Sequence, residues 1–346
     1  MPLTQAPVHP RRYRLHLAAV LCASSLGMAG CAVWAPPPMT AALQAQAVGG
    51  DQSGHVREQA ELSAVPFQPL DPVAQARHCG PQALAMALAY AGQSVDLNQL
   101  TRSTYLPARG GSLQVEMLAA ARRSGGFVVP VGGGLQGLIE AIDAGQPVLL
   151  LQNLGLPRWP SWHYAVLVGY DRLKREFVLR SGEEERQTLS WATFEHTWTR
   201  AGQWAVVVLA PGQLPPTPST RATPAALRRA ALDFEAVAPP LATAAVWRSL
   251  KRRWPEDLVA TVGLGNSLLA AGHMEAAADL LRQEAPRSES VVLWNNLAQV
   301  ELARGDRARA RDAAVQALQR SEGPQARWRA TVQATLRAID AEPAPR

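Results

Sequence analysis

The stretch RHCGPQALAMALAYAG, residues 77–92, decides the fold of the region around it. From Pro81 onward it is rich in alanine and unbroken until Gly92, and a proline is tolerated in the first turn of a helix. The pattern therefore predicts a helix with Cys79 at its N-terminus. The free N–H groups and the helix dipole there stabilise a thiolate, the nucleophilic form of cysteine, so we predict a lowered thiol pKa and a nucleophilic role.

The N-terminal segment predicts export. Residues 11–31 have a basic start, a short apolar run and then small residues, which is the layout of a secretory signal. We predict a signal peptide over residues 1–30. Of the three cysteines, Cys22 is then lost and Cys79 has no internal disulfide partner in an oxidising compartment. A functional thiol is a better explanation of Cys79 than a buried apolar residue.

The end of this segment, Met28-Ala29-Gly30-Cys31, resembles the lipobox of bacterial lipoproteins. The resemblance implies a lipid on Cys31, cleavage before it and a membrane anchor, whereas an ordinary signal peptide is the alternative. Ala32 implies a location at the outer membrane, facing the periplasm. Residues 31–62 contain a triple proline and no sustained apolar period, so we predict a lipidated N-terminus and a flexible tether.

Composition argues against a nucleic-acid partner. The formal net charge is +6, and three arginines with no acidic residue lie in residues 1–30, which leaves 6 − 3 = +3 for the mature chain. The arginines of the C-terminal third alternate with alanine and leucine at helical spacing, without the aromatic platforms of single-strand binders. Solvated helix faces explain them better.

A polar residue, His163, opens the apolar run HYAVLVGYD, residues 163–171. This β-branched, apolar run ends at a turn signal and predicts a buried strand. His163 lies 163 − 79 = 84 residues after Cys79, which leaves ample chain for the strand to return beside the helix start.

These motifs resemble those of C39-type cysteine peptidases, a papain-like family. The matching segments are Cys-Gly-Pro-x-Ala-Leu-Ala, the His163 run and Val-Leu-Arg-Ser-Gly at 178–182. Together with the C-terminal region they resemble a lipoprotein branch with TPR repeats. The resemblance covers residues 64–210 and implies a papain-like peptidase domain over 63–210. It also implies His163 as general base and acid, a peptide or protein substrate, and neither cofactor nor metal.

Two positions depart from the family pattern. Where C39 peptidases commonly carry Asp-Pro, this chain has Ser181-Gly182, so Ser181 is a candidate to orient His163 and a Cys–His dyad remains open. Papain-like enzymes place an oxyanion-hole glutamine about six residues before the cysteine, where this chain has Val73. Gln75, four residues before, is the candidate.

The remaining segments predict an α+β domain, with helices first and an antiparallel sheet after them. Trp159 and Trp162 lie in a loop rich in proline and tryptophan just before His163, and we predict that they form one wall of the cleft, although a packed loop is equally consistent. We expect helices at 81–92, 95–106, 112–123, 135–144 and 189–199, and strands at 127–131, 148–152, 163–171, 176–179 and 203–209.

The C-terminal third predicts an all-α TPR-like helical repeat domain, residues 225–340, after a Pro-rich linker at 211–224. Leu264 and Leu297 are 33 residues apart, as are Gly272 and Gly305. Such repeats bind a protein partner on their concave face, or else only cap the first domain. The sequence as a whole predicts a membrane-anchored cysteine peptidase. The alternatives are an inactive scaffold lipoprotein and a thiol acyltransferase or amidase.

Overall fold

The computed structural model describes residues 37–48, 57–69, 78–216 and 223–341. The predicted lipidation site, Cys31, and the oxyanion-hole candidate, Gln75, lie outside these residues. All described residues fall within one compact unit, Pro36–Arg346. None of the helices in the described part is both long and apolar enough for a membrane crossing.

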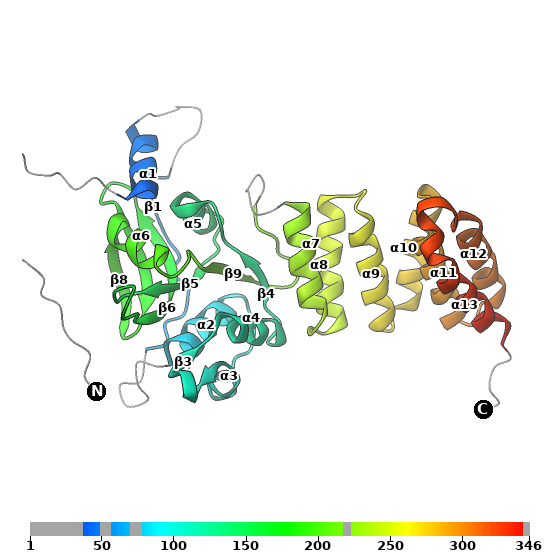
Figure 1. Ribbon diagram of the computed structural model, residues 1–346, viewed down its shortest axis with the longest axis horizontal. Helices are drawn as coiled ribbons and strands as arrows, with labels where there is room; N and C mark the ends of the chain where they lie inside the picture. The colour runs from blue at the N-terminus through cyan, green and yellow to red at the C-terminus, as the bar shows by residue number, and fades with distance from the viewer. Residues whose placement is uncertain (1–36, 49–56, 70–77, 217–222, 342–346) are drawn as a thin grey trace, which may run out of the picture. The chain divides into compact units, whose positions relative to one another are not determined.

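An antiparallel sheet organises the first half of the chain (Figure 1). Its strands follow the order β4-β9-β5-β6-β7-β8, and β1 pairs with the far end of β6, beyond the point where β5 ends. The strands are β1 (Gln59–Glu61), β4 (Phe127–Pro130), β5 (Val148–Asn153), β6 (Trp162–Asp171), β7 (Glu176–Ser181), β8 (Glu184–Ser190) and β9 (Ala205–Leu209).

Helices cover both faces of this sheet, which explains why its central strands are apolar without alternation. Leu149, Leu151 and Val166 share a buried cluster with α2 (Cys79–Tyr90) and α4 (Gln114–Arg123). Leu150 and Leu167 point to the opposite face, where they meet α5 (Gly134–Asp143) and α6 (Trp191–Thr199). The helix that begins at Cys79 is therefore central, and its residues 79–88 are all buried.

The region between α2 and α4 differs from the prediction. The helix expected at 95–106 is shorter, α3 (Leu97–Thr104), because the Asp96 side chain accepts the Asn98 and Gln99 N–H groups and fixes its start. The chain then forms a hairpin of β2 (Tyr105–Leu106) and β3 (Gly111–Ser112), joined by a 3-10 turn, η2 (Pro107–Arg109). The prediction of a helix start at Ser112 was wrong.

A second difference lies at the other edge of the sheet, where β8 was not predicted. This strand, EERQTLS, has largely exposed side chains, and it is held by its pairing with β7 rather than by an apolar pattern. The following helix starts at Trp191 instead of residue 189, because the Ser190 side chain accepts the Thr193 N–H and caps it.

Parts of the predicted tether form ordered elements. Residues Pro38–Val48 form α1, whose first N–H groups, from Met39 and Thr40, are bonded to the buried carboxylate of Glu195 at 2.9 and 2.5 Å. The first N–H groups of a helix have no partner within the helix, so this distant carboxylate stabilises α1. With β1 paired to β6, the prediction of a flexible tether is wrong for both stretches.

The C-terminal third is a succession of helices, each packed on its neighbours. The starts of α9 and α11 differ by 291 − 258 = 33 residues, and those of α10 and α12 by 307 − 274 = 33, which agrees with the period in the sequence. The helices are α7 (Pro224–Glu235), α8 (Pro240–Arg253), α9 (Leu258–Ala270), α10 (Met274–Glu284), α11 (Val291–Ala303), α12 (Arg307–Arg320) and α13 (Arg329–Asp340). A 3-10 turn, Gly323–Trp328, precedes α13.

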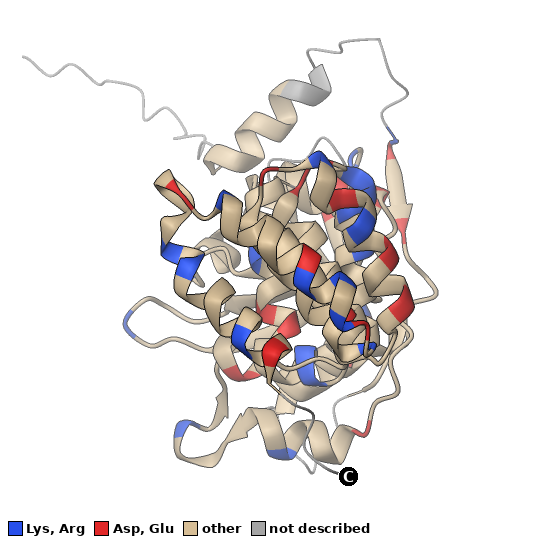
Figure 2. Ribbon diagram, turned by 90° about the vertical axis from the view of Figure 1, so that its right-hand side faces the viewer, with Lys and Arg blue, Asp and Glu red and all other residues tan. Residues whose placement is uncertain are grey.

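Basic and acidic residues are interspersed on the helical face shown in Figure 2. Several pair between helices: Arg282 bonds Glu301 at 2.8 Å, and Arg304 bonds both Glu301 and Glu275. The helices also contact the sheet region, because α7 packs on β4 through Phe234 and Phe127, whose rings lie 5.8 Å apart. Side chains on both sides of the predicted linker thus share one buried cluster.

Candidate active site

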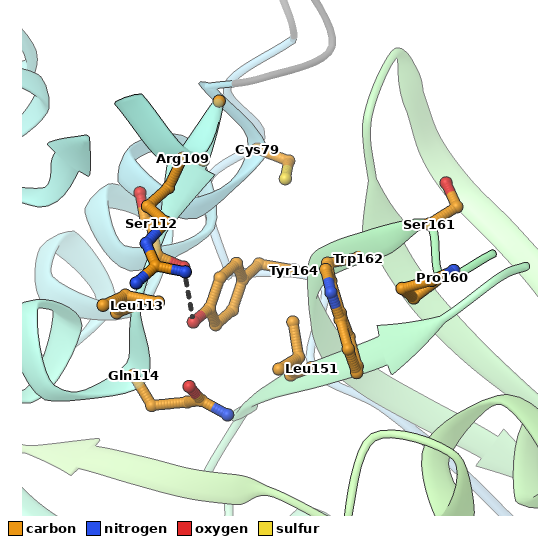
Figure 3. Close-up of a pocket in the computed structure, with 12 residues that line it drawn as sticks. Cys79, Arg109, Ser112, Leu113, Gln114, Leu151, Pro160, Ser161, Trp162 and Tyr164 are labelled. Carbon is orange, nitrogen blue, oxygen red and sulfur yellow. Dashed lines mark hydrogen bonds between the residues drawn. The ribbon is translucent and has the colours of Figure 1, made fainter. Parts of the chain in front are cut away.

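Cys79 is the first residue of α2 and lines a cleft of about 610 Å³. Figure 3 shows it between two walls. One wall comes from the β2–β3 hairpin and the residues after it, and the other from the start of β6 and the loop before it. The lining residues are Cys79, Arg109, Gly110, Gly111, Ser112, Leu113, Gln114, Leu151, Pro160, Ser161, Trp162 and Tyr164.

The thiol lies against the strand that carries His163. The backbone N–H of Tyr164, the residue that follows His163, and those of Gly80 and Cys79 itself act on the thiol and lower its pKa. Helix α2 packs directly on β6. The predicted juxtaposition of the helix start and the mouth of the strand is therefore present.

The protonation state of Cys79 differs from the prediction. The thiol is only 8% exposed, and burial raises its pKa, while the three backbone N–H groups act in the opposite direction. Burial also lowers the pKa of His163. The expectation of a lowered thiol pKa was wrong in direction, because the sequence reveals the helix N-terminus but not the depth of the thiol. At neutral pH Cys79 is therefore a thiol and His163 a neutral imidazole.

His163 is oriented by Ser181. The Nε2 atom of the imidazole lies 2.9 Å from the Ser181 hydroxyl oxygen, and Ser181, at the end of β7, is 6% exposed. This contact occupies Nε2 and leaves Nδ1 as the ring nitrogen available for the thiol proton. Asp171 is at the opposite end of β6, where it pairs with Lys174 at 3.5 Å, and takes no part in the site.

The β2–β3 hairpin is a part of the site that the sequence did not reveal. The Tyr164 hydroxyl donates to the Ser112 carbonyl at 3.2 Å and ties the hairpin to β6. A Cβ added at Gly80 would lie 2.8 Å from the Ser112 hydroxyl, so the hairpin also packs closely on the start of α2. The sequence signal for it is the Gly110-Gly111 pair, which lies between the two helices expected at 95–106 and 112–123.

The two predicted wall tryptophans separate in the structure. Trp162 lines the cleft and is 54% exposed, whereas Trp159 does not line it and is 72% exposed. Within the described residues no cluster of three or more histidine, cysteine, aspartate or glutamate side chains is arranged to hold a metal ion.

With this geometry established, the chain was compared with known proteins. Residues 67–206 match the Peptidase_C39 like family. The C39-like segment contains Cys79, His163, Ser181 and the cleft that Cys79 lines, and the match supports a cysteine peptidase kind of function for it. A comparison with curated proteins returned no match.

Two solved structures resemble the C39-like segment. One is described as a C39-like peptidase from Bacillus anthracis, with 22% identity and a TM-score of 0.38, and the match covers 44% of this chain and 98% of that one. The other is the peptidase domain of Streptococcus ComA, a bi-functional ABC transporter involved in a quorum sensing pathway. It has 17% identity and a TM-score of 0.34, and the match covers 42% of this chain and 98% of that one.

Proposed function

We propose that this chain is a cysteine peptidase in which Cys79 is the nucleophile and His163 the general base and acid. The observation that carries the proposal is the position of the Cys79 sulfur. It lies in a cleft at a helix start, where the backbone N–H next to His163 acts on it, and the His163 imidazole lies 2.9 Å from the Ser181 hydroxyl. A nucleophile, a base and a group that orients the base are the parts that such a mechanism requires.

The first step is a proton transfer from a neutral thiol. His163 has a lowered pKa and is therefore unprotonated at neutral pH, with Nε2 directed to Ser181. Nδ1 takes the thiol proton as the sulfur attacks the peptide carbonyl carbon. Burial disfavours a free thiolate in the empty site, so the thiolate forms together with the attack rather than before it.

The next steps use the start of α2. As the carbonyl carbon becomes tetrahedral, its oxygen gains negative charge, and the N–H groups at a helix N-terminus stabilise that charge. The Cys79 backbone N–H is one such donor, and we assign the other to the Gln75 side chain. His163 then protonates the leaving amine, and an acyl group remains on the sulfur. Water activated by His163 hydrolyses the thioester and regenerates the thiol.

The cleft suits an extended peptide. Leu113, Leu151 and Trp162 supply apolar surface on both sides of Cys79, and the hairpin wall has no side chain at Gly110 and Gly111. A peptide backbone can approach such a wall closely. We assign no cofactor to this chemistry.

The remaining parts of the chain are assigned to location and recruitment. A lipid on Cys31 would hold the enzyme on the periplasmic side of the outer membrane, and the helices of residues 225–340 would act as TPR-like repeats that bind a protein partner or the substrate. The lipobox-like sequence and the 33-residue offset between helix pairs support these assignments.

The test is labelling of the purified chain by an electrophilic peptide probe, together with cleavage of a defined peptide library followed by mass spectrometry. Wild type should be labelled at Cys79 and should cleave peptides, whereas Cys79→Ala should do neither. His196→Ala, an exposed histidine on α6, is the matched control and should behave as wild type. If Cys79 is labelled but no peptide is cleaved, the peptidase assignment is rejected, whether or not an amine or alcohol acceptor is added. Acyl transfer to that acceptor would identify a transferase.

A further inference from the structure

The loop before His163 presents an apolar surface that the cleft does not use. We call residues 154–161 the rim loop. Leu154, Leu156 and Trp159 in this loop are 51%, 60% and 72% exposed, although large apolar side chains are normally covered. None of the three lines the cleft. Exposed apolar side chains that gather in one segment mark an interaction site.

The rim loop is held in one shape by its own hydrogen bonds. The Asn153 side-chain oxygen accepts the Gly155 and Ser161 N–H groups at 3.0 and 2.9 Å, and the Leu154 N–H donates to the Ser161 carbonyl at 2.8 Å. A Cβ at Gly155 would lie 2.3 Å from the Trp159 carbonyl oxygen, so the turn closes tightly on this glycine. The apolar side chains are therefore projected outward by a fixed turn.

The chemistry of the loop fits the surface of a lipid bilayer. Tryptophan has an apolar body and a polar N–H and favours the boundary between acyl chains and headgroups, where leucine adds buried apolar area. Arg158 lies between Leu156 and Trp159 and is exposed, and no acidic residue occurs from Leu154 to Trp162. A guanidinium in that position can bind phosphate, and its charge favours anionic lipids.

We infer that the rim loop docks on the headgroup region of an anionic bilayer, with Leu156 and Trp159 inserted and Arg158 on the phosphates. The loop leads directly into Trp162, which lines the cleft, so docking places the cleft mouth beside the membrane surface. Peptides close to that surface then have access to Cys79. The lipid assigned to Cys31 would hold the chain on the membrane, and the loop would orient the cleft toward the membrane surface. The inference does not depend on peptidase activity.

Hydroxyl-radical footprinting of the full chain, reconstituted into phosphatidylethanolamine–phosphatidylglycerol vesicles, tests the docking. The oxidation rate of each side chain is divided by its rate in the urea-unfolded protein. Leu173 is the internal control, because it is 76% exposed and lies on the turn at the other end of β6. Leu156 and Trp159 should be protected about tenfold more than Leu173, since each buries a large apolar side chain. Equal protection of the three would overturn the inference.

Two variants and one added ligand complete the test. Trp159→Ser should reduce the protection of Leu156 severalfold, whereas Leu173→Ser should leave it unchanged. Replacing phosphatidylglycerol by phosphatidylcholine should weaken the protection of Leu156 and Trp159 in wild type. The same replacement should have a much smaller effect in Arg158→Gln, which lacks the guanidinium that binds the phosphates. If Trp159 became protected only when the peptide library was added, the loop would belong to the substrate site and the bilayer would be excluded as its partner.

Discussion

The cleft around Cys79 and the helical region after residue 223 differ in how their buried ionisable groups are stabilised. In the helices, Glu301 is 1% exposed, and its carboxylate is bonded by Arg282 and Arg304. In the cleft region, the Ser112 hydroxyl oxygen is buried and finds no partner among the described residues, and burial keeps both Cys79 and His163 uncharged. A buried polar group without a partner is costly in free energy.

This difference separates a scaffold from a reaction site. In the helices the Glu301 carboxylate is paired with two guanidinium groups, and removing it leaves them uncompensated. The cleft instead keeps hydrogen-bonding capacity free for a substrate, at the expense of local stability. Substitutions in the two regions should therefore change different measured quantities.

The largest effect is expected for His163→Ala. Loss of the group that takes and returns the proton should lower kcat/KM for peptide cleavage by about 10²–10⁴-fold. The melting temperature should fall only modestly, because the variant loses the hydrogen bond to Ser181 but no salt bridge among the described residues. A comparable activity in the variant would remove His163 from the mechanism.

Glu301→Ala should have the converse effect. It leaves two guanidinium groups without their shared carboxylate and should lower the melting temperature by about 5 °C or more. Glu289→Ala is the matched control, because Glu289 pairs with Arg320 at 3.2 Å but is 86% exposed, and it should change the melting temperature little. Probe labelling of Cys79 at 25 °C should be unaffected in both variants. A loss of labelling in Glu301→Ala would show that the two regions are coupled.

Ser181→Ala should have a smaller effect on turnover. The imidazole stays in place but loses the contact that fixes Nε2. We expect kcat to fall about tenfold, which is less than the loss expected when the general base itself is removed. Ser181→Asp should restore turnover and raise the pKa of His163, because a carboxylate stabilises the imidazolium. The acid limb of the pH–rate profile should then move to higher pH. Ser190→Ala, which removes the cap of α6, should change stability and leave the profile where it is.

The smallest effect concerns the pH dependence of Cys79 alkylation. Only the thiolate reacts, and burial raises the pKa of the thiol, so the rate in the free protein should increase through a midpoint above the ordinary value of about 8.5. His163→Ala should move the midpoint little, because the imidazole is already neutral there. A midpoint near neutrality that rises in His163→Ala would indicate a resting thiolate–imidazolium pair instead.

Local patterns in the sequence predicted the parts of the site that local interactions build. An alanine-rich run after Pro81 is sufficient for α2, and a β-branched run after His163 is sufficient for β6, so their contact could be expected. The Ser181 hydroxyl was likewise a candidate before its 2.9 Å contact with His163 was seen. The 33-residue period also corresponds to real helix starts.

The missed features depend on tertiary contacts. The β2–β3 hairpin interrupts a helical pattern because Ser112 is held by Tyr164 on another strand. The strand β8 has no apolar signature and owes its existence to β7. The direction of the Cys79 pKa shift depends on how deeply the thiol is buried, a quantity that no sequence motif encodes.

The contact between α1 and Glu195 also has a consequence for the order of folding. The Met39 N–H and its acceptor are separated by 156 residues, and Gln59 of β1 pairs with Asp171, 171 − 59 = 112 residues later. Closing a loop of this length early in folding has a large entropic cost. During synthesis from the N-terminus, α1 and β1 are also made well before the residues with which they pair. The N-terminal elements must therefore wait until β6 and α6 exist, so the first part of the chain to be made is among the last to reach its final place.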